Sequence, residues 1–197
     1  MLAAGPDLRH DPFMSASLAP GLLVAMPDLR DPDFFRGVVM LCAHTTEGAF
    51  GLVINHTLDI GVAAICAEAG VDWPHRESPA AYCGGPVERQ RGWVVHDAAQ
   101  RFPDTQYVHD GLALSASREA LKAYAQDPGG RYRLVLGYSG WGAAQLEEEM
   151  ASGSWLTAEL KAAAVFSTAP VHLWKETLAG LGVHEPSQLV SGSTRIH

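Results

Sequence analysis

The stretch GVVMLCAHTTEGAFGLVIN, residues 37–55, contains two apolar runs on either side of a short polar turn. The runs at 37–43 and 49–55 are rich in valine, leucine and isoleucine, as expected for strands that are covered on both faces. Glu47 and Gly48 lie in the turn between them, and the glycine tolerates a positive φ. The stretch therefore predicts a hairpin of two buried strands.

Further strand and helix patterns alternate along the chain. Strands are predicted at 21–26, 92–96, 132–136 and 163–167, together with one strand or a hairpin over 107–117. Helical spacing predicts helices over 60–70, 118–126 and 170–182, with Ser117 as the N-cap of the second. About seven or eight strands and four or five helices in mixed order indicate an α/β fold with α+β-like order.

Length and composition favour one domain that buries a sizeable core. The chain has 197 residues, of which 47% are hydrophobic. Residues 1–18 show no periodicity and are predicted to form a flexible N-terminal extension, so the domain is expected over 19–190 with a tail at 191–197. Neither a secretory signal pattern nor an apolar run of membrane-spanning length occurs, which predicts a cytoplasmic protein without a membrane partner.

Charge and cysteine content limit the classes of partner. The net charge of −8 and the scattered arginines disfavour direct binding to nucleic acid, which requires a basic face. The three cysteines lack a C-x-x-C spacing, so neither a disulfide framework nor a zinc site is indicated. The nine histidines likewise show no metal-ligand spacing. No metal and no cofactor are therefore predicted.

The segment LGYSGWGAAQLEEEM, 136–150, joins an apolar run to an acidic helical pattern through three glycines. A strand, a glycine turn and a helix also make up phosphate-binding loops and nucleophile elbows. The glycine spacing is G-x-x-G-x-G, the reverse of the dinucleotide fingerprint, and Trp141 stands where an elbow needs its second glycine. The segment is therefore interpreted as a fixed structural corner beside a cleft.

The glycine pair before Pro86 allows two interpretations. Gly84 and Gly85 either form a tight turn that packing demands or present amides to an anion, with Arg89 and Arg91 close in sequence.

Three blocks of sequence resemble the YqgE/AlgH family of small bacterial proteins. The first is AMPDLRDPDFFRGVVMLCAHTTEGAFGLVIN at 25–55, the second GGPVERQRGWVVH at 84–96, and the third LGYSGWGAAQLEEEM at 136–150. The resemblance covers about 18 to 190. It implies a mixed sheet that curls into a partial barrel, and a cytosolic bacterial-type protein. Most family members have no assigned activity, while the AlgH name implies regulation of gene expression.

Three hypotheses follow for the function. The first is a regulatory binding protein, acting indirectly on gene expression, whose cleft takes a small anionic ligand or a partner protein. The second is an enzyme that binds a nucleotide or phosphate ester at 137–142, for which no catalytic residue can be named. The third is a purely structural role. The candidate ligand-binding residues are Arg36, His44, Asn55, Gly84, Gly85, Arg91, His96, Gly137, Gly140, Trp141 and Gly142.

Overall fold

The computed structural model describes residues 17–185 and 189. The strands in this part of the chain are β1 Gly21–Ala25, β2 Val38–Thr45, β3 Gly48–Val53, β4 Thr57–Gly61, β5 Ala80–Cys83, β6 Val87–His96, β7 Gln106–His109, β8 Leu112–Ser115, β9 Tyr132–Gly142 and β10 Trp155–Ala158. The helices are α1 Val62–Glu68, α2 Arg118–Gln126, α3 Gln145–Ala151, α4 Ala162–Phe166 and α5 Pro170–Gly180. No helix in these ranges is long and apolar enough to cross a membrane.

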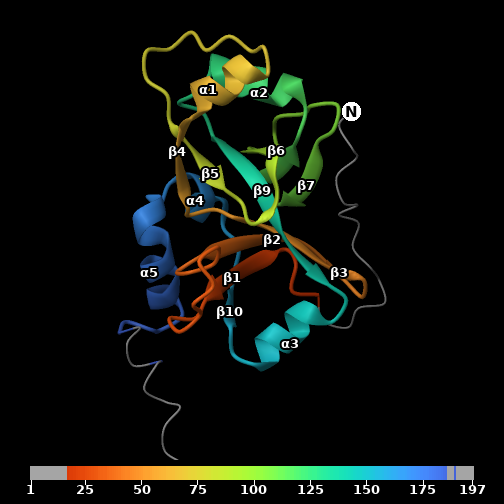
Figure 1. Cartoon of the computed structure of the whole chain (residues 1–197), viewed down its shortest axis with the longest axis vertical. Coiled ribbons are helices and arrows are strands. Elements are labelled where there is room, and N and C mark those ends of the chain that lie inside the picture. The colour runs from red at the N-terminus through yellow and green to blue at the C-terminus, as the bar shows by residue number, and fades with distance from the viewer. Residues whose placement is uncertain (1–16, 186–188, 190–197) are drawn as a thin grey trace, which may run out of the picture.

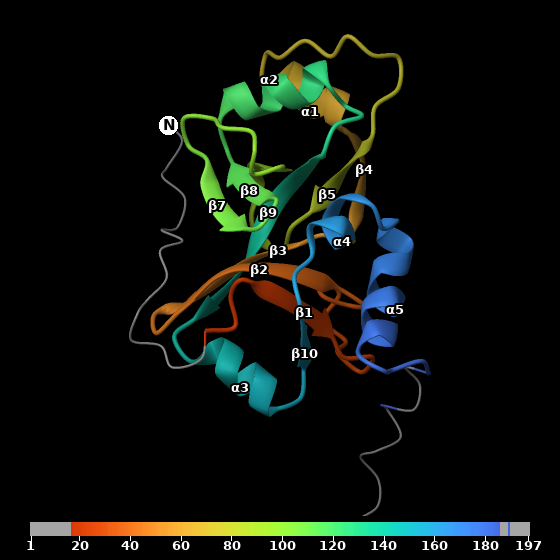
Figure 2. The ribbon, with the colours of Figure 1, turned by 180° about the vertical axis from the view of Figure 1, so that it is seen from behind.

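The strands form one mixed sheet that curls into a half-barrel, which confirms the predicted fold class (Figures 1 and 2). Its order is β10-β1-β2-β3-β9-β6-β8-β7, with β5 between β4 and β9. Most neighbours are antiparallel, whereas β5 and β9 are parallel. The long strand β9 pairs with β3 at its Gly142 end and with β6 at its Tyr132 end, so it belongs to both halves of the sheet.

Three apolar clusters pack against this sheet. The largest lies on the concave face, where Leu173, Trp174 and Leu178 of α5 cover side chains of β1, β2 and β3. On the convex face, α1 and α2 cover β6 and β9, while α3 covers β1, β2 and β3. Both views place α1 and α2 at one end of the molecule and α3 at the other (Figures 1 and 2).

Several elements match the sequence patterns. The predicted hairpin is β2–β3, in which Thr45 pairs with Gly48, and Gly48 has a φ of 139°. The pattern at 107–117 forms the β7–β8 hairpin. Helices occur near 60–70 and 170–182 as expected, and the Ser117 side chain accepts a hydrogen bond from the Ala120 amide at the start of α2.

Two predictions about local structure are wrong. The run at 163–167 lies mostly in helix α4, because four apolar residues with one β-branched side chain fit either element. The segment Gly137–Gly142 is not a turn, since β9 continues through it and pairs with β3 as far as Gly142. Strands β4, β5 and β10 were not predicted at all.

The predicted terminal segments are mostly beyond the described residues. The extension over 1–18 lies outside them except for Ser17 and Leu18, and the tail at 191–197 lies wholly outside. The Leu18 amide donates a hydrogen bond to His44 Nδ1 at 3.1 Å, so the chain is bound to β2 from at least this point.

Candidate functional site

Gly84 and Gly85, for which the sequence allows a tight turn or an anion cradle, lie where the turn before β6 crosses β9. The Gly84 amide donates to the Leu136 carbonyl at 2.7 Å, and the Ser139 hydroxyl donates to the Gly84 carbonyl at 2.9 Å. A Cβ atom at Gly85 would lie 2.5 Å from the Tyr138 carbonyl carbon, and one at Gly137 would lie 2.7 Å from the Gly85 oxygen. This crossing needs glycine for close backbone approach, which supports the packing interpretation.

His44 and Trp141 lie at the other end of β9, next to α3. Because Leu18 donates to His44 Nδ1, the proton of this imidazole is on Nε2, which donates to Glu147 Oε1 at 3.0 Å. The indole nitrogens of Trp141 and Trp155 both donate to Glu149 Oε2, at 2.9 and 2.8 Å. Two of the three consecutive glutamates therefore accept hydrogen bonds from buried side chains.

Gly140 and Gly142 lie in β9, opposite Phe50 and Gly48 of β3. The Gly142 amide donates to the Gln145 side chain at 3.0 Å. Helix α3 has seven residues and begins after Ala144, whose φ is 61°. The amides of 140–143 therefore do not form the helix N-terminus that the phosphate-binding alternative requires.

Arg36 and Asn55 meet beside β2 and α5. The Asn55 side chain accepts a hydrogen bond from the Val38 amide at 2.7 Å and donates one to the Arg36 carbonyl at 2.9 Å. The Arg36 guanidinium lies 5.5 Å from the centre of the Trp174 ring. Asn55 thus fixes the loop that precedes β2.

Arg91 and His96 point to opposite faces of β6. The Arg91 guanidinium stacks over Trp93, 4.5 Å from the ring centre, and contacts Glu88 at 3.1 Å. His96 is fully buried, and burial lowers its pKa. Its Nδ1 donates to the Asp97 carbonyl at 2.9 Å, which leaves Nε2 to accept from the Ser115 hydroxyl at 3.0 Å. The Thr105 hydroxyl, 3.0 Å from that of Ser115, extends this chain of hydrogen bonds.

The eleven predicted residues therefore occupy several separate places instead of one cleft, and their role in ligand binding stays a prediction. The Ser139 hydroxyl donates to a carbonyl, and the half-buried Cys83 thiol lies 3.9 Å from the Gly85 carbonyl oxygen. Burial raises the pKa of the Cys42 and Cys66 thiols. Across residues 17–185 and 189, no group of three or more His, Cys, Asp or Glu side chains is placed to hold a metal ion.

A cavity of about 400 Å³ lies between α1, α2 and the convex face of β6 and β9, and we call it the α1–α2 cavity. Its walls are Ile65 of α1 and Leu121 of α2, and Leu134 and Leu136 of β9 form its floor together with Gly92 of β6. Each helix turns its apolar side to the sheet, because Val62 and Cys66 of α1 and Ala120 and Tyr124 of α2 are buried there.

Gly92 has no side chain and therefore leaves space at the floor of this cavity. Its φ is outside the left-handed region, and a Cβ atom would lie 3.8 Å from Leu134 Cδ1 and from Leu136 Cδ2, which is ordinary van der Waals contact. A glycine inside a strand costs about 0.5–1 kcal/mol relative to alanine. Neither the backbone conformation nor close packing requires glycine here, so its distinguishing effect is to leave space in the cavity.

Polar groups gather at the cavity rim. The Arg118 Nε donates to the Ala69 carbonyl at 3.0 Å, and Nη2 donates to the Gly70 carbonyl. These bonds join the start of α2 to the end of α1. Within the described ranges, Nη1 of this guanidinium makes no hydrogen bond. Glu68 and Gln90 complete the polar rim.

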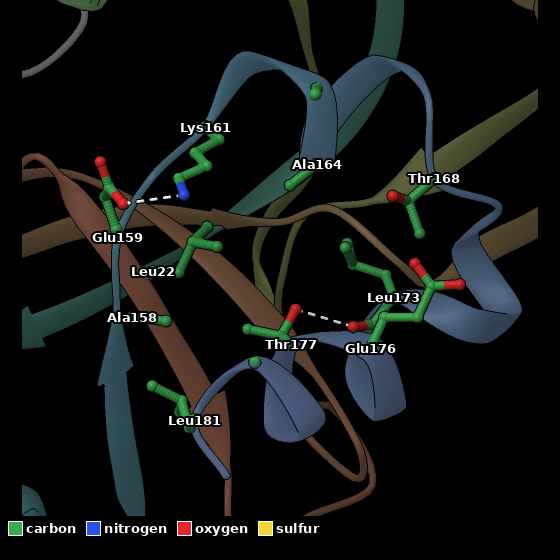
Figure 3. Close-up of a pocket in the computed structure, with 12 residues that line it drawn as sticks. Leu22, Ala158, Glu159, Lys161, Ala164, Thr168, Leu173, Glu176, Thr177 and Leu181 are labelled. Carbon is green, nitrogen blue, oxygen red and sulfur yellow. Dashed lines mark hydrogen bonds and ion pairs between the residues drawn. The ribbon is translucent and has the colours of Figure 1, made fainter.

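A second hollow, the α5 groove, lies between α4, α5 and strands β1 and β10 (Figure 3). Its volume is about 350 Å³. Leu22, Ala158 and Leu173 give it an apolar floor, and Glu159, Lys161 and Glu176 lie at its rim. Sequence reasoning missed both hollows, since their lining residues come from segments that are distant along the chain.

Comparison with known proteins agrees with the motifs. A family model described as AlgH-like matches residues 22–185. The chain is 46% identical over 178 residues to a UPF0301 protein of Myxococcus xanthus, covering 89% of this chain and 97% of the relative. It is 39% identical over 170 residues to a UPF0301 protein of Xanthomonas campestris, covering 84% and 90%.

Two solved structures share the fold. The solution structure of the AlgH protein from Pseudomonas aeruginosa gives a TM-score of 0.71 at 32% identity, covering 95% of this chain and 99% of that one. The crystal structure of a protein from Corynebacterium diphtheriae gives a TM-score of 0.66 at 25% identity, covering 95% and 94%. The chain belongs to the AlgH-like family, the YqgE/AlgH family that its three sequence blocks resemble.

Proposed function

We propose that this protein is a cytoplasmic regulatory protein that binds a small amphipathic anion in the α1–α2 cavity. The observation that carries the proposal is Gly92, a strand glycine whose absent side chain keeps the apolar floor of the cavity open. Its effect on gene expression would be indirect, because the chain has a net charge of −8 and only scattered arginines.

The size and chemistry of the cavity support a small ligand. Pockets that bind small molecules measure roughly 300–1,000 Å³ and combine apolar walls with a few polar groups. The α1–α2 cavity has about 400 Å³, with Ile65, Leu121, Leu134 and Leu136 around an apolar interior. An alkyl or aromatic body of the ligand would fill this space.

Arg118 supports an anionic head group. Its Nε and Nη2 are held by the carbonyls at the end of α1, so the guanidinium is fixed at the rim before a ligand arrives. Nη1 can then donate to a carboxylate or phosphate oxygen. A ligand in this position would contact α1, α2 and the sheet together, and binding would strengthen the attachment of both helices to the rest of the protein.

The enzyme alternative has less support. The amides of 140–143 lie in or just after a strand, and the Ser139 hydroxyl is bonded to a backbone carbonyl. A nucleophile needs an adjacent base, and the buried Ser115–His96 pair faces Phe102 and the chain between β6 and β7 instead of either hollow. We therefore do not extend the proposal to catalysis.

The test uses a series of straight-chain carboxylates of increasing length as probes. We expect affinity to rise about fourfold per methylene group until the cavity is full, since each buried methylene contributes about 0.8 kcal/mol. Gly92→Leu should fill the floor and abolish binding, and Arg118→Gln should weaken binding of every member by a similar factor. Isothermal titration calorimetry measures both effects, and a thermal shift reports on folding.

Gly180→Leu is the matched control, because it places the same side chain in the α5 groove, where no atom lies within 4 Å of the added Cβ. It should leave carboxylate binding unchanged. Equal affinities for wild type and a folded Gly92→Leu variant, or no binding by any chain length, would disprove the proposed site.

A further inference from the structure

Strand β10 forms one edge of the sheet and pairs with β1 alone. The Met26 amide donates to the Ser154 carbonyl at 3.0 Å, and the register continues from there through Val24 opposite Leu156 to Leu22 opposite Ala158. In an antiparallel ladder the same bonding recurs at every second residue. The intervening residues therefore direct their backbone groups away from β1.

Those residues are Trp155 and Thr157. Among the described residues, their amides and carbonyls make no backbone hydrogen bond to a turn, a loop or a helix end. Thr157 is also exposed. The outer edge of β10 thus offers two sets of donors and acceptors in the spacing that a further strand would match.

Strand β10 is short, with four residues, but it lacks three other common protections of an edge strand. Native edges are commonly blocked by charged residues, proline or a bulge. WLTA contains neither a charge nor proline, and its register with β1 has no irregularity. The opposite edge strand β7, in contrast, has a register shift between Tyr107 and His109. The openness of β10 is therefore a local property of this edge.

The α5 groove continues from this edge over the concave face (Figure 3). Leu22 and Ala158 face it from the sheet, and Leu173 faces it from α5. Every second side chain of a strand added to β10 would be on the same face and point toward the groove. Main-chain bonds and a side-chain pocket are the two parts of recognition by strand addition.

Charge indicates what kind of segment fits. Lys161 is paired with Glu159 at 3.0 Å, whereas Glu176, exposed on α5, has no ion pair within the described ranges. Figure 3 places the two carboxylates on opposite sides of the groove. The two glutamates and one lysine of the rim therefore carry one net negative charge, and the chain as a whole carries a net charge of −8. A basic segment complements both.

We propose that β10 binds an extended basic segment of a partner protein as an added strand, with apolar side chains of that segment in the α5 groove. This interaction is separate from ligand binding in the α1–α2 cavity, and it identifies the surface through which the protein contacts a partner.

The probe for the test is a labelled seven-residue peptide of alternating valine and threonine with a lysine at each end, measured by fluorescence anisotropy. Thr157→Pro removes an outward N–H and leaves the β1 ladder intact, so the variant should fold and bind at least about tenfold more weakly. Thr157→Ala retains the N–H and should bind normally. Glu176→Lys should weaken binding about fivefold, as expected for one charge pair at a rim.

Two further peptides distinguish strand addition from other contact. One carries N-methyl groups on its odd residues and the other on its even residues, so each has one blocked edge. We expect one of them to bind and the other not, and Gly92→Leu should leave peptide binding unchanged. The proposal is overturned if both N-methylated peptides bind, if folded Thr157→Pro binds like wild type, or if no peptide binds up to about 1 mM.

A second copy of the chain could also add a strand to β10, and a self-association experiment tests for it. If wild type is a dimer by analytical ultracentrifugation and Thr157→Pro is a monomer, a second copy of the chain occupies β10, and the proposal of a separate partner is wrong. If wild type and Thr157→Pro are both monomers, the result agrees with a separate partner protein.

Discussion

At the scale of single residues, polar side chains fix the ends of strands. Glu149 accepts hydrogen bonds from the indoles of Trp141 and Trp155, and Asn55 bonds the Arg36 carbonyl and the Val38 amide where the loop before β2 ends. His96 joins β6 to β8 and to the segment that follows β6 through Ser115 and the Asp97 carbonyl. Each of these side chains satisfies backbone or indole groups that burial would otherwise leave unpaired.

His96 should make stability fall at mildly acidic pH. Burial lowers its pKa in the folded protein, and its Nε2 accepts a hydrogen bond only while neutral. The unfolded chain therefore binds more protons below about pH 6.5, the ordinary histidine pKa. The stabilisation is fully present above that value and is lost as the pH falls through the lowered folded pKa.

Urea unfolding at about pH 7.5 and about pH 5 measures this effect. The free energy of unfolding of His96→Gln should change less between the two conditions than that of wild type. Above about pH 7.5 the two proteins should depend on pH alike, which is the internal control. An equal loss of stability at acidic pH in both would refute a role for His96.

At the scale of elements, the crossing of β9 with the turn before β6 determines where glycine is needed. Gly85 and Gly137 have φ values of 144° and 73°, and each faces the backbone of the other segment. Gly140, three residues further along β9, faces only the ring of Tyr138 at 3.4 Å from an added Cβ. Two glycines of one sequence motif therefore have different structural roles.

Alanine substitution should separate these roles. Gly137→Ala combines a left-handed φ with a Cβ atom 2.7 Å from the Gly85 oxygen, so it should lower the free energy of unfolding by at least about 1–3 kcal/mol. Gly140→Ala should not lower it and should raise it by up to about 1 kcal/mol, because alanine is favoured over glycine inside a strand. Chemical denaturation gives both values. A large loss from Gly140→Ala with a small one from Gly137→Ala would contradict this assignment.

At the scale of the whole molecule, β9 joins the two halves of the half-barrel. Its first residues pair with β6 beneath α1 and α2, and its last residues pair with β3 beside α3. Because one continuous strand belongs to both halves, unfolding of either half removes hydrogen-bonded neighbours from the other. The helices at the two ends of the molecule are thus coupled through the sheet (Figures 1 and 2).

Unfolding should therefore be a single cooperative transition. Tryptophan fluorescence reports on indoles at both ends, with Trp141 and Trp155 near α3 and Trp73 against Tyr124 of α2, while far-ultraviolet circular dichroism reports on all helices and strands. The two signals should give coincident urea midpoints. Separate midpoints, with the fluorescence change ahead of or behind the loss of secondary structure, would show that the two ends unfold independently.

The sequence by itself determined the local structure and the family. The β2–β3 hairpin, the Ser117 cap of α2 and the helix at Pro170 follow from patterns within about a dozen residues, since hydrophobic period, cap and turn chemistry are local. The three motif blocks identified the AlgH-like family and its curled sheet. The alternation at 107–117 likewise indicated strands without settling that they form a hairpin.

Only the tertiary structure decided which residues meet. Gly137–Gly142 resembles a turn in isolation, but β3 supplies a neighbour with which it pairs as a strand. The predicted site residues are separated because β9 is one extended strand. It places Gly137 beside the turn before β6 and Trp141 beside α3. Conversely, Ile65, Gly92 and Leu134 share the α1–α2 cavity from three elements. Long-range pairing and packing over the sheet create such contacts, and neither leaves a periodic signal in the sequence.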